Sequence, residues 1–202
     1  MSPKRTELKE LKEKLYQMCH LTKRMLDITW QGFDSYCEKY MGEAKQIGKE
    51  IDSQEKILTP LLVEKAAIDE EIKSLVLIPG NLERIGDNLE SILYSNCTMN
   101  AQGILFSDKA IKELNFLFEK LSELIECVAD CILTKNKVLL KHIREEGEEL
   151  NHQADEFADG HEQRLVTGVC IPKSSPIYLD ILDSLKEISR HIRGIAKVVE
   201  LP

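Results

Sequence analysis

Apolar side chains recur every three or four residues along almost the whole chain, which is the spacing of one face of an α-helix. The pattern predicts an all-α protein with six long helices. We expect these helices at about residues 6–39, 43–66, 69–96, 107–135, 138–166 and 175–199. Gly42 is expected to separate the first two helices, and Pro60 and Pro79-Gly80 are expected to kink or interrupt the helices that contain them.

Three of the predicted helices begin with residues that favour a helix N-terminus. Asp69 precedes Glu70 and Glu71, Ser107 precedes Asp108, and Ser175 precedes Pro176. Serine and aspartate side chains accept hydrogen bonds from the free N–H groups of the first turn. Proline suits the first helical position, where no N–H is needed. We therefore expect N-caps at Asp69, Ser107 and Ser175.

The two halves of the sequence resemble each other at a constant offset of 103 residues. Under this offset Asp52 corresponds to Asp155. The apolar residues Leu82, Ile85, Leu89 and Ile92 correspond to Leu185, Ile188, Ile192 and Ile195. Because three pairs of helices share one offset, we infer a tandem duplication. It predicts two three-helix bundles packed side by side, comprising residues 1–103 and 104–202.

Composition supports a helical protein and narrows its partners. The chain has 202 residues, of which 43% are hydrophobic, with only 10 Gly, 6 Pro and 5% aromatic residues. This length and apolar fraction suffice for a packed core. The formal net charge of -8 argues against nucleic acid as a partner, because phosphate backbones need clustered Lys and Arg. The same charge favours the binding of cations.

Apolar runs and cysteines indicate a cytoplasmic location. No run approaches the roughly 20 apolar residues that a membrane-spanning helix needs, so no membrane insertion is expected. The sequence opens with Met-Ser-Pro-Lys-Arg and continues as a charged helix, which is unlike a signal peptide. The six cysteines show no Cys-x2-Cys pair, so we expect them to be reduced.

Two acidic residues on the third helix are the first candidates for metal ligands. Glu83 and Asp87 are four residues apart and therefore lie one turn from each other on the same helix face. Asp52 on the second helix is a candidate third ligand from across the bundle. Carboxylates from neighbouring helices can hold iron, manganese or magnesium. The alternative is a solvated helix face on which Arg84 forms the local salt bridge.

A second candidate set lies in the second half. His152, Asp155, Glu156 and Asp159 share one face of the fifth helix, and Glu187 and His191 repeat the spacing on the sixth. Mixed histidine and carboxylate ligands suit zinc, iron or nickel. The alternative is an exposed acidic helix without a ligand. A basic stripe of Lys186, Arg190, Arg193 and Lys197 could receive phosphate or an acidic partner, or neutralise the acidic fifth helix beside it.

The sequence contains no recognisable catalytic arrangement. It has no Gly-rich phosphate loop, no nucleophile elbow and no Cys/His pair with a meaningful spacing. A ferritin-like di-metal enzyme would need Glu-x-x-His on two helices, and this chain has none. We therefore expect a protein that is not an enzyme.

The stretch Leu-Glu-Arg-Ile-Gly-Asp at residues 82–87 resembles the PhoU family of phosphate-transport regulators, whose motif there is Leu-Glu-Arg-Ile-Gly-Asp-His. Ile51-Asp52 and Ala154-Asp155 resemble the Ile/Ala-Asp step on the second helix of each family repeat. The resemblance covers essentially the whole chain. It implies two three-helix bundles and metal clusters held by Glu/Asp-x-x-x-Asp pairs. It also implies a role in holding phosphate uptake down, with a phosphate transporter or its sensor kinase as partner.

Two departures from the family motif restrict what the resemblance implies. Lys186 and Arg190 stand where a second Glu/Asp-x-x-x-Asp pair belongs, so the second metal cluster is not carried over. Asn88 replaces the motif histidine, although His191 occupies the matching place in the second half. The chain is also similar to the cytoplasmic PhoU-like part of sodium/phosphate cotransporters. The alternative function is a helical scaffold or adaptor without a functional metal, and a homo-oligomer is a further assembly it could form.

Overall fold

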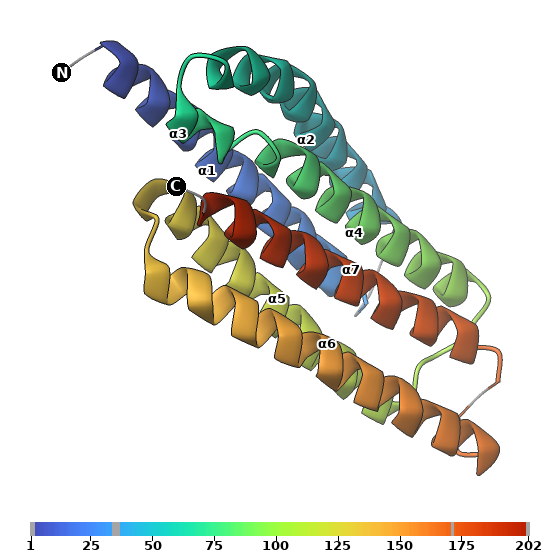
Figure 1. The fold of residues 1–202 in the computed structure, drawn as a ribbon. Coiled ribbons are helices and arrows are strands. Elements are labelled where there is room, and N and C mark those ends of the chain that lie inside the picture. Colours follow the sequence, from blue (N-terminus) through green and yellow to red (C-terminus); the bar gives the residue numbers. More distant parts are fainter. Residues whose placement is uncertain (1–2, 34–36, 171, 201–202) are drawn as a thin grey trace.

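The computed structural model describes residues 3–33, 37–170 and 172–200, and all regular structure within them is helical (Figure 1). The helices are α1 (Pro3–Gln31), α2 (Cys37–Ala66), α3 (Glu70–Lys73), α4 (Ile78–Ala101), α5 (Asp108–Thr134), α6 (Lys137–Val166) and α7 (Ser175–Val199). Six of these helices are long, and α3 is a single turn between α2 and α4. The predicted all-α fold with six long helices is therefore confirmed.

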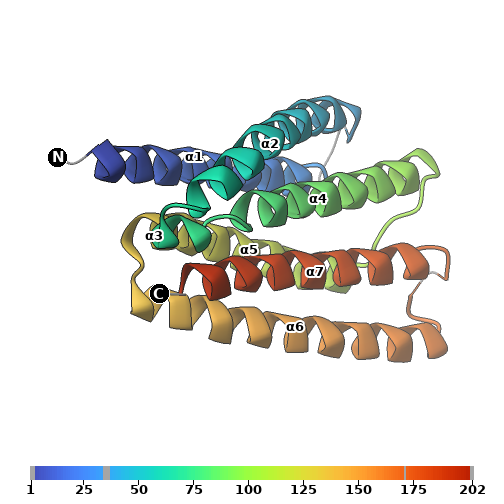
Figure 2. The ribbon, with the colours of Figure 1, turned by 45° about the horizontal axis from the view of Figure 1, so that its top comes forward.

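The long helices form two three-helix bundles that lie side by side. Helices α1, α2 and α4 pack against one another, as do α5, α6 and α7. The bundles meet where α4 packs on α7 and α1 packs on α5, which leaves α2 and α6 at opposite edges (Figures 1 and 2). Each helix at this interface therefore faces its counterpart under the 103-residue offset. The predicted division at residue 103 lies in the segment between α4 and α5, and the duplication itself stays a prediction.

Two predicted helix boundaries in the first half are wrong. The helix expected over residues 6–39 ends at Gln31, and α2 already includes Lys39 and Gly42. Residues 34–36 of the expected range lie outside the described residues. A glycine inside a helix costs only about 1 kcal/mol, and Ala44 and Ile47 bury the opposite face of this turn. Pro60 also lies within α2, which continues to Ala66.

The predicted caps have different outcomes. Asp69 accepts a hydrogen bond from Glu71 N, and Ser107 accepts one from Ala110 N, so both N-caps are confirmed. The expected break at Pro79-Gly80 is a fresh start at Ile78, with proline in the first turn of α4. The cap predicted at Ser175 is wrong, because the N-cap residue of α7 is Ser174.

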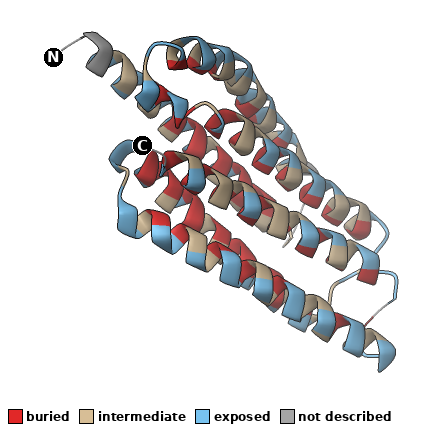
Figure 3. Ribbon diagram, viewed as in Figure 1, coloured by how far each residue is buried: buried red, intermediate tan, exposed pale blue. Residues whose placement is uncertain are grey.

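The core runs through both bundles and across their interface. Buried residues line the inward faces of the long helices (Figure 3). Aromatic rings join the halves, because Trp30 stacks on Phe118 and Phe33 contacts both Phe106 and Phe118. The Trp30 indole N–H also donates to Asn115 Oδ1 at 2.9 Å.

The cysteines depart from the expectation that all six are reduced. Cys97 is disulfide-bonded. Four others, Cys19, Cys127, Cys131 and Cys170, are free. Burial raises the pKa of the Cys19 thiol well above its usual range and that of Cys131 to about 12, so both are protonated at neutral pH. These two behave as small core residues rather than as reactive thiols.

Candidate cation site

An acidic cavity opens between α2 and α4 in the first half. It has a volume of about 190 Å³. Its lining residues are Gly48, Lys49, Ile51 and Asp52 from α2, and Glu83, Gly86, Asp87 and Glu90 from α4. The three predicted ligands, Asp52, Glu83 and Asp87, therefore share one cavity, although they come from two helices. Glu90 is a fourth carboxylate that the sequence reading did not select.

The packing of α2 on α4 places these carboxylates at the same groove. Ile51 and Ile85 are buried. Ile51 directly precedes Asp52, and Ile85 lies two residues from both Glu83 and Asp87. A Cβ at Gly86 would lie 3.6 Å from Ile51 Cδ1, and one at Gly48 would lie 3.5 Å from Glu90 Oε2. Both are ordinary contact distances, so the two helices pack closely here without requiring glycine. Apolar packing thus holds the backbone of both acidic edges in register.

The cavity carries negative charge that is only partly compensated. Asp52 Oδ2 pairs with Lys56 Nζ at 2.7 Å, whereas within the described chain Glu83, Asp87 and Glu90 form no ion pair. Desolvation raises the pKa of Glu83, and the nearby charges of Asp87, Glu55 and Asp52 raise it further against the opposing effect of Arg84. Arg84 therefore acts on Glu83 only at longer range, and the local salt bridge of the alternative reading is not formed. A cation entering the cavity would relieve this repulsion.

The donor chemistry of the cavity fits a hard or borderline metal ion. Its carboxylate oxygens are the ligands preferred by magnesium and manganese, and they also suit iron. Within the described residues, however, no three His, Cys, Asp or Glu side chains are already arranged to hold one ion. Binding would therefore require side-chain rotation at the rim, which is feasible because Asp52 has 46% of its side chain exposed.

The second predicted ligand set is not brought together. His152 Nε2 lies 3.5 Å from Glu156 Oε1 on the exposed face of α6. Asp155 instead binds Lys186, Glu187 pairs with Arg190, and His191 Nδ1 lies 3.0 Å from Asn81 Oδ1 of α4. These residues point to three different partners. The arrangement is that of local ion pairs and a contact between the halves, so the mixed histidine and carboxylate site is not assembled.

A buried ion pair in the second half was missed by the sequence reading. Glu113 of α5 is only 3% exposed and receives two hydrogen bonds from Arg164 of α6, at 2.8 and 3.1 Å. The hydroxyl of Tyr178 of α7 donates to Glu113 Oε2 at 2.5 Å. Burial raises the pKa of Tyr178, and the hydrogen bond to Glu113 raises it further. A charged residue inside the apolar stripe of α5, between Ala110 and Leu117, was the available signal.

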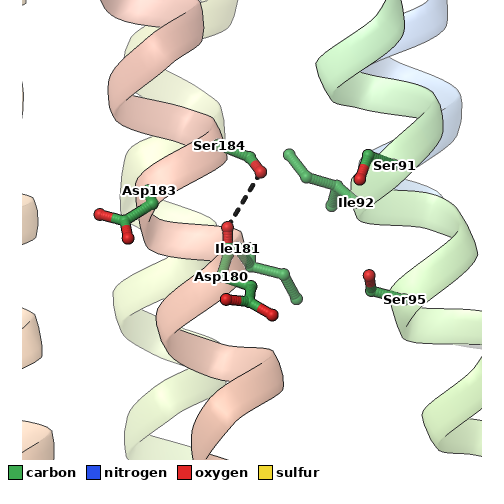
Figure 4. A pocket seen from close by; sticks show the side chains of 7 residues that line it. All are labelled: Ser91, Ile92, Ser95, Asp180, Ile181, Asp183 and Ser184. Carbon is green, nitrogen blue, oxygen red and sulfur yellow. Dashed lines mark hydrogen bonds between the residues drawn. The ribbon is translucent and has the colours of Figure 1, made fainter.

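A second cavity, of about 260 Å³, lies between the halves (Figure 4). Ser91 and Ser95 of α4 face Asp180 and Ser184 of α7 across it. The Ser184 hydroxyl donates to the backbone carbonyl of Asp180, and the Asp183 carboxylate points away from α4 toward Lys186 (Figure 4). One carboxylate therefore remains at this cavity, which makes it a poorer cation site than the first.

Comparisons of the sequence with models of known families, and with curated proteins, find no match. Solved structures do match. PhoU from Pseudomonas aeruginosa superposes with a TM-score of 0.85 at 17% sequence identity, over 96% of this chain and 96% of that chain. The chain has the PhoU fold. A second structure, the phosphate transport system regulatory protein PhoU from Streptococcus pneumoniae, gives a TM-score of 0.83 at 13% identity, over 96% and 93% of the chains.

The PhoU fold extends through both three-helix bundles of this chain. The resemblance of residues 82–87 to the PhoU motif is therefore accompanied by the same overall arrangement of helices. Among the described helices, none combines the length and apolar character needed to cross a membrane.

Proposed function

We propose that the chain is a PhoU-like regulator of phosphate transport or phosphate signalling. The observation that carries the proposal is the PhoU fold over 96% of the chain, together with the Leu-Glu-Arg-Ile-Gly-Asp stretch that lines the acidic cavity. As a regulator it would dock on a phosphate transporter subunit or a sensor kinase and hold uptake down when phosphate is ample. We propose that it does so without catalysis, because the sequence contains no recognisable catalytic motif.

The regulatory role is tested in cells that carry the gene. Removal of the chain should raise phosphate uptake in phosphate-rich medium, and the wild-type chain should restore control. Co-purification with the transporter or the kinase, after crosslinking in intact cells, should identify the docked partner. Unchanged uptake after removal, with no transporter or kinase crosslinked, would contradict the proposal.

The metal role of the regulator is assigned to Asp52, Glu83 and Asp87, with iron, zinc, manganese or magnesium as the ion. The support is the shared cavity and its uncompensated charge. A titration with Mn²⁺, followed by calorimetry, should show binding to the wild type that Glu83→Ala removes. Asp155→Ala is the matched control, because Asp155 already holds Lys186, and it should leave Mn²⁺ binding unchanged.

A helical scaffold or adaptor without a functional metal is the second candidate. It is favoured by the absence, within the described residues, of any three ligand side chains already placed around one point. A scaffold predicts that metal-free protein and metal-loaded protein bind the same partner equally well. A metal-dependent regulator predicts partner binding that is lost after chelation.

Cytoplasmic location and self-association belong to the same proposal. The compartment is tested at the Cys97 disulfide, since cytosolic thiols are normally kept reduced. A disulfide at Cys97 that is still present after rapid alkylation of intact cells would contradict a cytoplasmic location. A homodimer belongs to the same proposal, and the molecular mass of the purified chain in solution tests it.

A further inference from the structure

In each half, a lysine ammonium forms an ion pair with the aspartate at one corresponding position. In the first half Lys56 Nζ lies 2.7 Å from Asp52 Oδ2. In the second half Lys186 Nζ lies 2.7 Å from Asp155 Oδ1 and 3.2 Å from Asp183 Oδ1. Asp52 and Asp155 correspond under the 103-residue offset, but the two lysines do not. The carboxylate at this position is therefore neutralised in both halves. In the first half the lysine belongs to the same helix, and in the second half it belongs to the neighbouring helix.

The two lysines differ in how firmly they are held. Lys186 comes from α7, crosses to α6, binds two carboxylates and has 30% of its side chain exposed. Lys56 lies one turn beyond Asp52 on the same helix, binds one carboxylate and has 68% of its side chain exposed. An exposed pair of residues four apart on a helix contributes little to stability. Lys56 can therefore leave Asp52 at small cost, whereas Lys186 is part of the packing of two helices.

Lys56 also interacts electrostatically with other carboxylates of the cavity. Its hydrogen bond to Asp52 is the main cause that raises the pKa of Lys56, and the charges of Glu55 and Glu83 raise it further. The ammonium thus lies within electrostatic reach of two of the carboxylates assigned to the metal. Lys49 lines the same cavity but forms no ion pair within the described chain. It carries the same charge as Lys56 without the contact to Asp52, so it serves as a control.

We propose that Lys56 is a built-in competitor for the cation of the acidic cavity, which must give up Asp52 before a metal ion can use that carboxylate. The inference rests on the proposed metal role of Asp52, Glu83 and Asp87. One ammonium of charge +1 leaves Asp52 Oδ2 and one divalent ion takes its place, so the charge at the carboxylates becomes one unit more positive and no co-reactant is needed. The pair keeps the cavity partly neutral when metal is scarce and raises the metal concentration at which it fills.

The test is a calorimetric titration of the full chain with Mn²⁺ at pH 7. Lys56→Met should bind Mn²⁺ about three- to fivefold more tightly than the wild type, because a weak direct competitor and its positive charge are both removed. Lys49→Met should gain less than about twofold, because it removes only a nearby charge that salt screens. Lys56→Arg should stay within about twofold of the wild type, since it keeps the cation beside Asp52.

A second readout follows the lysine itself. With Mg²⁺ as a diamagnetic probe and labelled lysine side chains, the Lys56 ε signal should move on metal addition while the Lys49 signal moves less. Equal affinities for the wild type and Lys56→Met, or equal gains for Lys56→Met and Lys49→Met, would overturn the competition and leave the metal role standing. Failure of both the wild type and Lys56→Met to bind Mn²⁺ would overturn the metal role and the competition together.

Discussion

The first half packs α2 on α4 and the second half packs α6 on α7, but the edges of these two contacts carry opposite charge. Glu83, Asp87 and Glu90 line the cavity at the first edge, called the first groove below. Under the 103-residue offset Lys186, Arg190 and Arg193 take their places at the second edge, called the second groove below. The aspartate of the neighbouring helix is kept in both. In the second groove it binds Lys186 of the neighbouring helix, whereas in the first groove it binds Lys56 of its own helix. The first groove differs in its three further carboxylates, which form no ion pair within the described chain.

This difference shows which part of the site the fold determines. Packing of apolar stripes places the two helices and their rim positions in both halves. The identity of the rim side chains then decides whether the groove attracts a cation or is already neutral. The proposed metal site would therefore depend on three or four rim residues, and it could be lost without any change in the bundle.

The halves also differ in their cores. Glu113, Arg164 and Tyr178 form the buried polar network of the second half. Arg164 and Tyr178 correspond to Leu61 and Leu75 of the first half, and Glu113 corresponds to Glu10, which is exposed. The first bundle thus packs leucines where the second packs an ion pair, which should make the second more sensitive to substitution there.

The largest expected effect is on stability, from breaking that ion pair. Arg164→Met should lower the free energy of unfolding by about 2–4 kcal/mol, because the buried Glu113 would keep only Tyr178 and the exposed Lys109, whose Nζ lies 3.5 Å away. Leu61→Met, the matched change in the first half, should cost less than about 1.5 kcal/mol. Urea unfolding of both variants provides the measurement. A loss below about 1 kcal/mol for Arg164→Met would show that the two cores are equivalent.

Restoring acids to the second groove should create a second cation site. Lys186→Glu combined with Arg190→Asp copies Glu83 and Asp87, frees Asp155 and should strengthen Mn²⁺ binding to the second half by about 100-fold. Lys186→Met with Arg190→Met is the control, because it removes the bases without adding ligands. Mn²⁺ electron paramagnetic resonance would count the bound ions. One ion per chain in both double variants would mean that the backbone of the second groove is not equivalent to the first.

A smaller effect is expected from buried histidine in the second half. Burial lowers the pKa of His161, and the charge of Arg164 lowers it further against the opposing effects of Glu113 and Glu162. The folded state therefore binds a proton less readily than the unfolded state. Stability is complete above the ordinary histidine pKa of about 6.5 and is lost as the pH falls below it.

His161→Leu, which copies Leu58 of the first half, should flatten this acid loss. His191 acts in the same direction, since burial also lowers its pKa, whereas Glu83 acts in the opposite one because its pKa is raised. Unfolding free energies at pH 7 and pH 5 for the wild type and His161→Leu provide the comparison. An acid loss that is the same in both proteins would place its origin outside the second core.

Much of the fold could be predicted because it depends on periodicity. The apolar spacing of the long helices and the capping by Asp69 and Ser107 are local signals, and both are found in the structure. The break at Gly42 was wrong because tertiary burial of Ala44 and Ile47 overrides the low helix propensity of one glycine. Pro79-Gly80 predicted either a kink in one helix or the start of a new helix, and the structure shows a new helix that begins at Ile78.

The candidate site was predictable only in part. Glu83 and Asp87 follow from their spacing, and Asp52 follows from its place on the neighbouring helix and from the resemblance of Ile51-Asp52 to the PhoU family. The pairing of Lys56 with Asp52 was not predicted, because the sequence alone does not show which lysine forms an ion pair with which carboxylate. Glu113 and Arg164 are 51 residues apart, so only the three-dimensional packing of α5 on α6 reveals their pairing. The separation of His152 from His191 likewise depends on which helices meet.

The central claim is that only the first groove takes up a cation. Equilibrium dialysis against Mn²⁺, followed by elemental analysis, tests it with the wild type, Glu83→Lys and Glu187→Lys. Glu83→Lys places in the first groove the residue that already neutralises the second, and Glu187→Lys is its charge-matched control on α7. The account predicts one bound ion for the wild type and Glu187→Lys and none for Glu83→Lys, with unchanged helix content. No ion in the wild type, or one ion retained by Glu83→Lys, would contradict it.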